Sequence, residues 1–325
     1  MKKIILGIVL SAVLICLSLR ELKFQAVVEA IHGIQPSYVL LSLAMMLLMQ
    51  VLRAIRWGGI LKPVANIDRF TLFSITAVGF LAITAIPARL GELVRPLLIS
   101  RKKHVPMATA LGTIFVERIM DTFAVLLMAG VLFPLIPLPP WLVRSVSLIT
   151  IITLAAAACF ILLIVNRNVL RNLEKHLPAS LRESYTGKLN HLIGHFINGF
   201  SVITDGKRLA WLFLLSLLVW IVDVLVIYAL FLAFGYTLSP LAAFALMFIL
   251  LVGISVPTAP GFVGNWHYAC ILALTLFGLN KADALSFAVV YHALAVGMTL
   301  VLGLIFLPCN RFPLKDLRSE KSNDT

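Results

Sequence analysis

A short motif that occurs twice in an otherwise apolar chain constrains the fold more than any other feature of the sequence. Residues 87–91 and 260–264 both read Pro-x-x-x-Gly, which joins a helix breaker to a flexible residue. The same spacing carries the apolar run 38–52 onto the apolar run 211–225. A duplicated unit with broken helices at matching positions is typical of transporters, in which the breaks meet near the membrane midplane and form the binding site. The sequence therefore predicts a protein that binds or moves something within a membrane.

The composition supports this class. Hydrophobic residues make up 61% of the 325 residues and charged residues only 13%, and the mean hydropathy is +1.03. The formal net charge is +13, but the basic residues gather beside apolar runs, which favours anionic lipid headgroups over nucleic acid as partners. The four cysteines include no C-x-x-C pair and are interpreted as small apolar residues.

The distribution of Lys and Arg predicts the topology, because cytoplasmic loops carry the excess of these residues. We expect both termini on the cytoplasmic side of the inner membrane, and the basic residues Arg53 and Arg56 on that side after the second span. The apolar start of the chain is interpreted as an uncleaved first span, since it has no clear small-x-small cleavage site. The expected spans are about 4–19, 38–52, 106–135, 145–166, 209–234 and 284–308.

Two segments are expected to enter the membrane and return to the same side. The apolar run 70–87 is followed by five cations at positions 89–103, so a hairpin over 70–104 that turns near Pro87 fits the charge rule better than a full crossing. A second hairpin is expected over 241–279, turning at Pro257 and Pro260. Units 38–135 and 209–308 would then have opposite orientations.

The predicted fold is thus an all-α polytopic membrane protein, a single domain over 1–325 with about eight to ten helical segments in an inverted-topology repeat. Span 145–166 and a cytoplasmic amphipathic segment over 167–208 would link the two units.

Glu117, Arg118 and Asp121 lie within about one turn of an apolar span. An ionisable group at membrane depth costs roughly 2.5–3.5 kcal/mol on the insertion scale, so each of them needs a reason. One interpretation is a structural ion pair that braces the helices. The other is that Arg118 binds a lipid phosphate, for which its planar fork of donors is suited, while the carboxylates hold or exchange with it.

Arg89, Glu92 and Arg95 follow the first break at three-residue spacing and would line one side of a short helix. A helix that begins near Gly91 would also direct free N–H groups and a positive dipole end into the site, which favours an anion. Ordinary inner-leaflet charge is the alternative explanation for Arg89 and Arg95.

In the second unit, Asn265, His267 and His292 stand where the first unit has charges, and His292 has nearly the place of Arg118. The histidines are candidate proton carriers or phosphate donors, or else core residues whose hydrogen bonds are satisfied. Asp223 lies in the middle of an apolar span and is expected to pair across helices with Arg118 or a histidine. Pro87, Gly91, Pro260, Gly261 and Gly264 are the expected hinges.

The motifs of several enzyme classes are missing. The sequence has no H-E-x-x-H, no G-x-S-x-G and no Walker loop, and we predict no enzyme activity, no metal site and no cofactor.

The runs 89–96 (Arg-Leu-Gly-Glu-Leu-Val-Arg-Pro), 117–121 (Glu-Arg-Ile-Met-Asp) and 259–264 (Ala-Pro-Gly-Phe-Val-Gly) resemble the lysylphosphatidylglycerol synthase transmembrane-region family, also called flippase-like proteins. The resemblance covers nearly the whole chain. It implies a bacterial or archaeal inner-membrane protein; in the bifunctional synthases this region flips aminoacylated phosphatidylglycerol, and a separate soluble domain makes it. That domain is not in this sequence, so synthase activity is not implied. His267 stands where the family motif often has Glu, and His292 replaces a later Arg.

We therefore expect a lipid flippase or transporter whose cargo is an anionic phospholipid or an isoprenoid phosphate. Two alternatives remain open: a non-transporting, lipid-binding accessory of a membrane glycosyltransferase, and an intramembrane transferase that uses Glu92 or Asp121 as a base. The expected partners are membrane lipids and no nucleic acid, and either a homo-oligomer or a membrane-enzyme partner is compatible with the sequence.

Overall fold

The computed structural model describes residues 32–86, 91–135, 194–255 and 260–310, with a few isolated positions between 144 and 155. Within these ranges the regular secondary structure is helical and no strand is present. The expected span 4–19, most of the span 145–166 and of the amphipathic segment, and the residues Pro87, Arg89 and Pro257 lie outside the described residues.

The described helices of the two halves follow the same sequence of lengths: long, medium, short and long. The first half contains a 26-residue, a 17-residue, a 10-residue and a 26-residue helix: α3 (Pro36–Leu61), α4 (Arg69–Ala85), α5 (Val94–Lys103) and α6 (Met107–Leu132). The second half contains helices of 28, 16, 12 and 26 residues: α10 (Gly206–Ala233), α11 (Pro240–Ser255), α12 (Asn265–Leu276) and α13 (Lys281–Phe306). Short 3₁₀ helices are η2 (Phe133–Leu135), η3 (Ser201–Thr204), η4 (Pro260–Phe262) and η5 (Pro308–Asn310).

Four of these helices, α3, α6 with η2, α10 and α13, are long and apolar enough to cross a membrane. The shorter helices α4 and α11 are also apolar. The all-α membrane class predicted from the sequence is confirmed.

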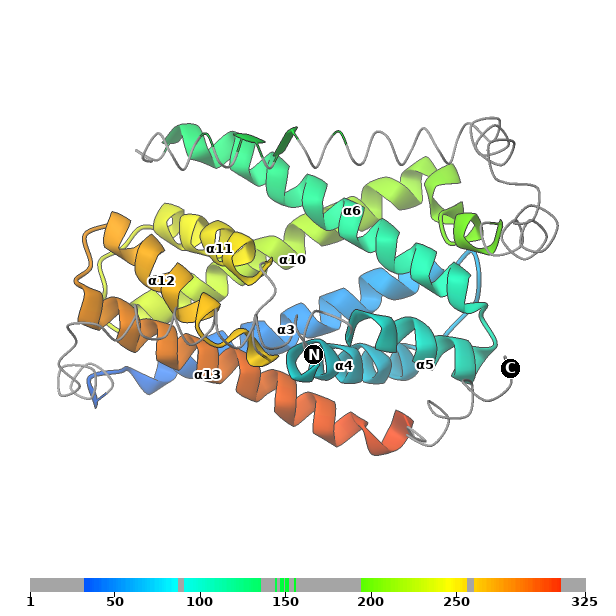
Figure 1. Ribbon diagram of the computed structural model, residues 1–325, viewed down its shortest axis with the longest axis horizontal. Coiled ribbons are helices and arrows are strands. Elements are labelled where there is room, and N and C mark those ends of the chain that lie inside the picture. The colour runs from blue at the N-terminus through cyan, green and yellow to red at the C-terminus, as the bar shows by residue number, and fades with distance from the viewer. Residues whose placement is uncertain are drawn as a thin grey trace, which may run out of the picture.

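The long helices α3 and α10 pack along each other in the middle of the molecule, and α6 and α13 flank them (Figure 1). In the view of Figure 1, α3 and α13 run from left to right, whereas α6 and α10 run from right to left. Corresponding helices of the two halves therefore point in opposite directions. The pairs α4/α5 and α11/α12 both turn back near the centre, where η4 packs against α4.

Local sequence signals explain where these helices begin and end. Asp68, Asp205 and Asn280 each accept a backbone N–H in the first turn of α4, α10 and α13, at 2.8, 3.1 and 2.9 Å. The Thr71 N–H that caps α4 also lowers the pKa of the Asp68 carboxyl to about 2. At the other end, α4 stops at Ile86, which is extended (φ −98°, ψ 124°) because the next residue is a proline.

Among the described helices, the bounds agree with the four expected spans that can be compared, except at the end of the second span. That span was expected over 38–52, with Arg53 and Arg56 beyond it, but α3 continues to Leu61 and contains both arginines. Arg56 is only 1% exposed. The expectation that Arg56 lies beyond the end of the span is wrong, because Arg56 is inside α3, where buried carboxylates pair with it.

Candidate functional site

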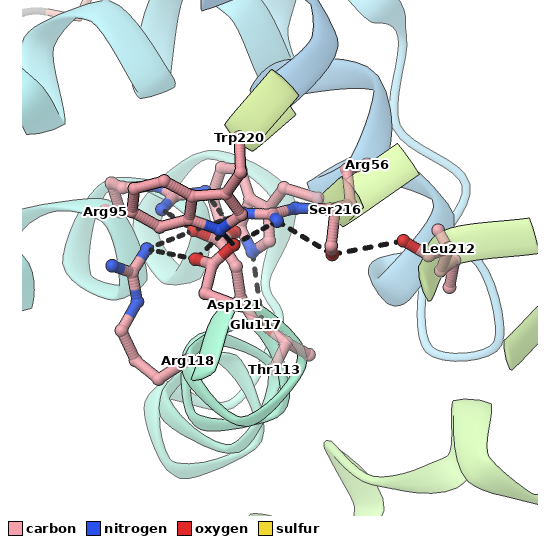
Figure 2. A network of polar contacts seen from close by, with 10 residues as sticks. Arg56, Arg95, Thr113, Glu117, Arg118, Asp121, Leu212, Ser216 and Trp220 are labelled. Atoms are coloured by element: carbon pink, nitrogen blue, oxygen red, sulfur yellow. Dashed lines mark hydrogen bonds and ion pairs between the residues drawn. The ribbon is translucent and has the colours of Figure 1, made fainter. Parts of the chain in front are cut away.

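Two buried carboxylates on α6 form the centre of a polar network. Glu117 and Asp121 are one turn apart and point to the same side of the helix. Each is held at two points by an arginine from another helix (Figure 2). Arg95 of α5 donates to both oxygens of Glu117, at 2.9 and 3.0 Å. Arg56 of α3 donates to both oxygens of Asp121, from Nη2 to Oδ2 at 3.1 Å and from Nη1 to Oδ1. The network therefore joins three helices of the first half.

Neutral donors and acceptors on α10 extend the network into the second half. Ser216 Oγ accepts from Arg56 Nη1 at 2.8 Å, and Trp220 Nε1 donates to Asp121 Oδ1 at 3.1 Å. Buried charges are tolerated only when they are paired and hydrogen-bonded in this way. These contacts fix the relative positions of α3, α6 and α10. The residues that make them are Arg56, Asp121, Ser216 and Trp220.

Arg95 is 2% exposed and fits closely against its surroundings. Its guanidinium carbon lies 4.3 Å from the centroid of the Trp57 ring, a cation–π contact. On α4, Gly79 leaves room for the side chain: a Cβ there would lie 2.2 Å from Arg95 Cγ. Glycine at this position is thus a steric requirement of the Arg95–Glu117 pair.

Arg118 differs from the two buried arginines. Its side chain is 44% exposed, and its contacts to the carboxylates all come from one nitrogen, Nη2, at 2.6 Å from Glu117 Oε1 and 3.5 Å from Asp121 Oδ2. Glu92 lies within electrostatic range. In Figure 2 the far end of the Arg118 guanidinium points away from the carboxylates. Of the three arginines, it alone has a side chain that is substantially exposed.

A second set of charged residues connects this network to the other half. The guanidinium carbon of Arg53 lies 4.7 Å from the Phe80 ring centroid and within electrostatic range of Asp121 and Asp223. Asp223 in turn lies within electrostatic range of Tyr291 on α13. The cation near Asp223 is therefore Arg53, and not the Arg118 or histidine expected from the sequence.

At the second break, Gly261, Phe262 and Gly264 all have positive φ angles, of 73°, 59° and 93°. At Gly261 and Gly264 the chain can turn sharply because glycine adopts such angles without strain. His292 Nε2 lies 2.6 Å from the Gly261 carbonyl oxygen, and the rings of His267 and His292 meet edge to face at 4.9 Å. The two histidines are thus brought together at the break.

Two polar atoms beside this break have no hydrogen-bond partner in the described part of the chain: the buried indole N–H of Trp266 and Nδ1 of His267. Asn265, the first residue of α12, donates instead to the Gly253 carbonyl at 3.0 Å and ties α12 to α11. The region therefore combines a braced backbone with unpaired polar atoms that a ligand could engage.

The two halves match closely at the site. Helices α6 and α13 have the same length, 26 residues, and Arg118 and His292 are each the twelfth residue of their helix. Glu117 and Tyr291 are each the eleventh. Arg118 and His292 thus occupy the same position in two helices of equal length.

Comparison with known proteins identifies the family of this chain. A model of the family described as "Lysylphosphatidylglycerol synthase TM region" matches residues 4–303. The chain belongs to this family. Similar proteins include two that are named "UPF0104 membrane protein", both from Methanothermobacter thermautotrophicus: one is 22% identical over 94% of each chain, and the other 27% identical over 84% of each chain. The "Glycosyltransferase AglD" of Haloferax volcanii is 22% identical over 93% of this chain and 53% of its own length.

In this member of the lysylphosphatidylglycerol synthase transmembrane-region family, the predicted site residues form two groups. Arg95, Glu117, Arg118 and Asp121 meet in the α6 network, and Asn265, His267 and His292 surround the second break with Pro260, Gly261 and Gly264. Glu92 lies in a 3₁₀ turn ahead of α5, near Arg118. Gly91 is buried where a Cβ would lie 2.2 Å from the backbone of Ala82.

Sequence reasoning missed Arg56, Ser216 and Trp220, which complete the network. For Arg56 a partial signal exists, because three of the next five residues, Trp57–Leu61, are large and apolar, although the two glycines between them disfavour a helix. Ser216 and Trp220 carry no such signal, because a Ser or Trp in an apolar helix has many structural uses.

Proposed function

We propose that this protein is a lipid flippase that binds an anionic headgroup between its two short-helix pairs, and that it has no enzyme activity of its own. The observation that carries the proposal is the asymmetry among the three arginines of the network. Arg56 and Arg95 are buried, and each donates to a carboxylate from both terminal nitrogens. Arg118 is 44% exposed and contacts the carboxylates through Nη2 alone. An accessible guanidinium edge is suited to bind phosphate oxygens at two points.

The other two arginines explain how Arg118 can act without disrupting the fold. Arg95 already provides two hydrogen bonds to Glu117, and Arg56 two to Asp121. When Arg118 turns toward a lipid phosphate, each carboxylate keeps its own buried partner, and no charge is left unpaired. The contacts from Arg118 Nη2 to the carboxylates would hold the side chain between binding events.

We further infer that the α4/α5 and α11/α12 pairs are re-entrant hairpins in an inverted-topology repeat, with both termini on the cytoplasmic side of the inner membrane. The opposite directions of corresponding helices and the matched positions of Arg118 and His292 support this inference. His267, His292 and Trp266 would then face the cargo from the second unit, as donors to the headgroup or as proton carriers.

A second candidate function is a lipid-binding accessory of a membrane glycosyltransferase. The match to about half of a protein named as a glycosyltransferase favours it, and in this role the chain would supply lipid binding to a separate transferase. The site residues would be the same, but no lipid would cross the membrane.

A scrambling assay in proteoliposomes separates the two candidates. Purified protein is reconstituted with fluorescent phospholipids or polyprenyl phosphates, and the fraction of label that becomes accessible to an external quencher is followed over time. A flippase accelerates the movement of at least one anionic lipid over that in empty vesicles. If no lipid in the panel moves faster while binding of the same lipids is retained, the accessory function replaces the flippase.

A further inference from the structure

A groove of about 760 Å³ lies outside the network, where the last turns of α3 meet the start of α4 and the first half of α10. None of the residues that donate to the Glu117 and Asp121 carboxylates lines it, and neither does Ser216. Its volume is in the usual range for a small-molecule site. The groove is therefore a separate concave feature of the surface.

The walls and the rim of the groove differ in chemistry. The walls are apolar and include Ile55, Phe73 and Leu215. The charged residues that line it are all cationic: Lys62, Arg69 and Arg208. A cavity with apolar walls and a positive rim is complementary to a lipid with an anionic headgroup.

The nearby acidic residues do not fully neutralise this rim. Asp68 pairs with Lys103 at 3.2 Å, away from the groove. Asp205 lies 3.5 Å from Arg208 but does not line the groove. Lys62 and Arg69 have no ion pair within 4.0 Å among the described residues.

An exposed tryptophan indicates the level at which the groove lies in the membrane. Trp211 lines it and is 60% exposed. Tryptophan is enriched at the level of the lipid headgroups, where its ring contacts apolar chains and its N–H stays hydrated. The cationic rim and Trp211 thus indicate that the groove opens at the headgroup level and its apolar walls continue toward the acyl chains.

We propose that this groove binds one anionic phospholipid, with its phosphate at Lys62, Arg69 and Arg208 and an acyl chain along the apolar walls. The proposal needs only that the protein lies in a membrane, and it does not depend on transport through the Arg118 network. The occupant is a bilayer lipid and not free phosphate, because the apolar walls account for most of the lining.

Native mass spectrometry of the detergent-solubilised protein, titrated with phosphatidylglycerol and separately with phosphatidylcholine, tests the proposal. The double variant Lys62→Gln/Arg69→Gln should bind the first equivalent of phosphatidylglycerol about tenfold more weakly, or worse, with phosphatidylcholine unchanged. Ile55→Trp, which fills the groove, should weaken the binding of both lipids. The matched control is Lys207→Gln, since Lys207 is exposed and precedes Arg208 but does not line the groove.

Three results would overturn the proposal: unchanged binding of phosphatidylglycerol in the double variant, equal losses in the double variant and in Lys207→Gln, or equal affinity of the unaltered protein for both lipids. Inorganic phosphate at the same concentrations should not compete, and competition by it would point to a simple anion site. Measuring scrambling by the same variants keeps the two proposals apart. If a groove variant no longer binds phosphatidylglycerol but still scrambles lipid, the groove is a lipid site that transport does not need. If the unaltered protein does not scramble any lipid and only the groove variants lose phosphatidylglycerol, the groove proposal holds and the transport proposal fails.

Discussion

Arg95 and Glu117, 22 residues apart in the sequence, form a two-point ion pair between α5 and α6 with N–O distances of 2.9 and 3.0 Å. The pair fixes the first short-helix pair to a membrane-spanning helix. It depends on Gly79 of α4, because any Cβ at that position would lie 2.2 Å from Arg95 Cγ. A backbone position on a third helix therefore controls whether the pair can form.

Gly79→Ala should weaken this pair. The added methyl group displaces Arg95 or shifts α4, and overpacking of this kind typically costs about 1–3 kcal/mol. We expect a lower melting temperature in detergent and slower lipid scrambling. Gly130→Ala is the matched control, because Gly130 is also in a long helix and a Cβ there meets nothing within 4 Å. Equal behaviour of the two variants would show that the close packing around Arg95 is unimportant.

Arg56 and Arg118 should respond differently to loss of charge. Arg56→Met removes both direct hydrogen bonds from arginine to Asp121, and breaking a buried pair costs roughly 3–5 kcal/mol. Arg118→Met should cost less, because Arg95 and Arg56 still hold the carboxylates and Arg118 is 44% exposed. Melting temperatures of the two variants test the order, and Asp121→Asn should partly rescue Arg56→Met. If Arg118→Met proves the more destabilising, Arg118 is a structural residue.

Gly264→Ala tests the second break. Gly264 has φ 93° and ψ −64°, a conformation that residues with a Cβ rarely adopt, and such strain costs about 1–3 kcal/mol. We expect reduced thermal stability and reduced scrambling. Gly297→Ala in α13 is the control: its helical backbone and open surroundings should make it neutral or slightly stabilising. A fully stable Gly264→Ala protein would contradict the conformation of the break.

Cys309 can report on the proposed topology. It is exposed, and its carbonyl oxygen accepts a hydrogen bond from Lys102 Nζ at 2.8 Å, so the end of α5 and the end of α13 lie on the same side. In a variant whose only cysteine is Cys309, impermeant thiol reagents should label permeabilised but not intact cells. A cysteine introduced at Leu138, with the natural ones removed, should be labelled in intact cells. Labelling of Cys309 from outside would reject the cytoplasmic assignment and, with it, the re-entrant first hairpin.

The part of the site that the sequence predicts follows local spacing. Glu117 and Asp121 are four residues apart on a helix, and their shared face follows from helical geometry alone. The near match of Arg118 to His292 is a prediction from the spacing of the two Pro-x-x-x-Gly motifs. By contrast, the partners of Arg56 are distant in the sequence: Asp121 lies 65 positions after it and Ser216 lies 160 positions after it. Which residues meet across such distances is decided by how helices pack, and one sequence carries no spacing rule for it.

The same reason explains the error at Asp223. An isolated carboxylate in an apolar helix predicts a basic neighbour, but the choice among Arg53, Arg118 and the histidines depends on the rotation of α10 against α3. The packing of α3 along α10 brings Arg53 into electrostatic range. Sequence reasoning identified the need for a cation and could not identify which one.

The measurement that tests the central claim most directly is lipid scrambling by Arg118→Lys, with the melting temperature recorded on the same preparation. Lysine keeps the charge but lacks the planar two-point fork, so a phosphate site should lose most of its function while the fold survives. We predict a melting temperature close to that of the unaltered protein and a scrambling rate at least about tenfold lower, which corresponds to about 1.4 kcal/mol. Arg101→Lys, at an exposed position of α5, should leave both unchanged. Full scrambling by Arg118→Lys would contradict the account and remove Arg118 from the site.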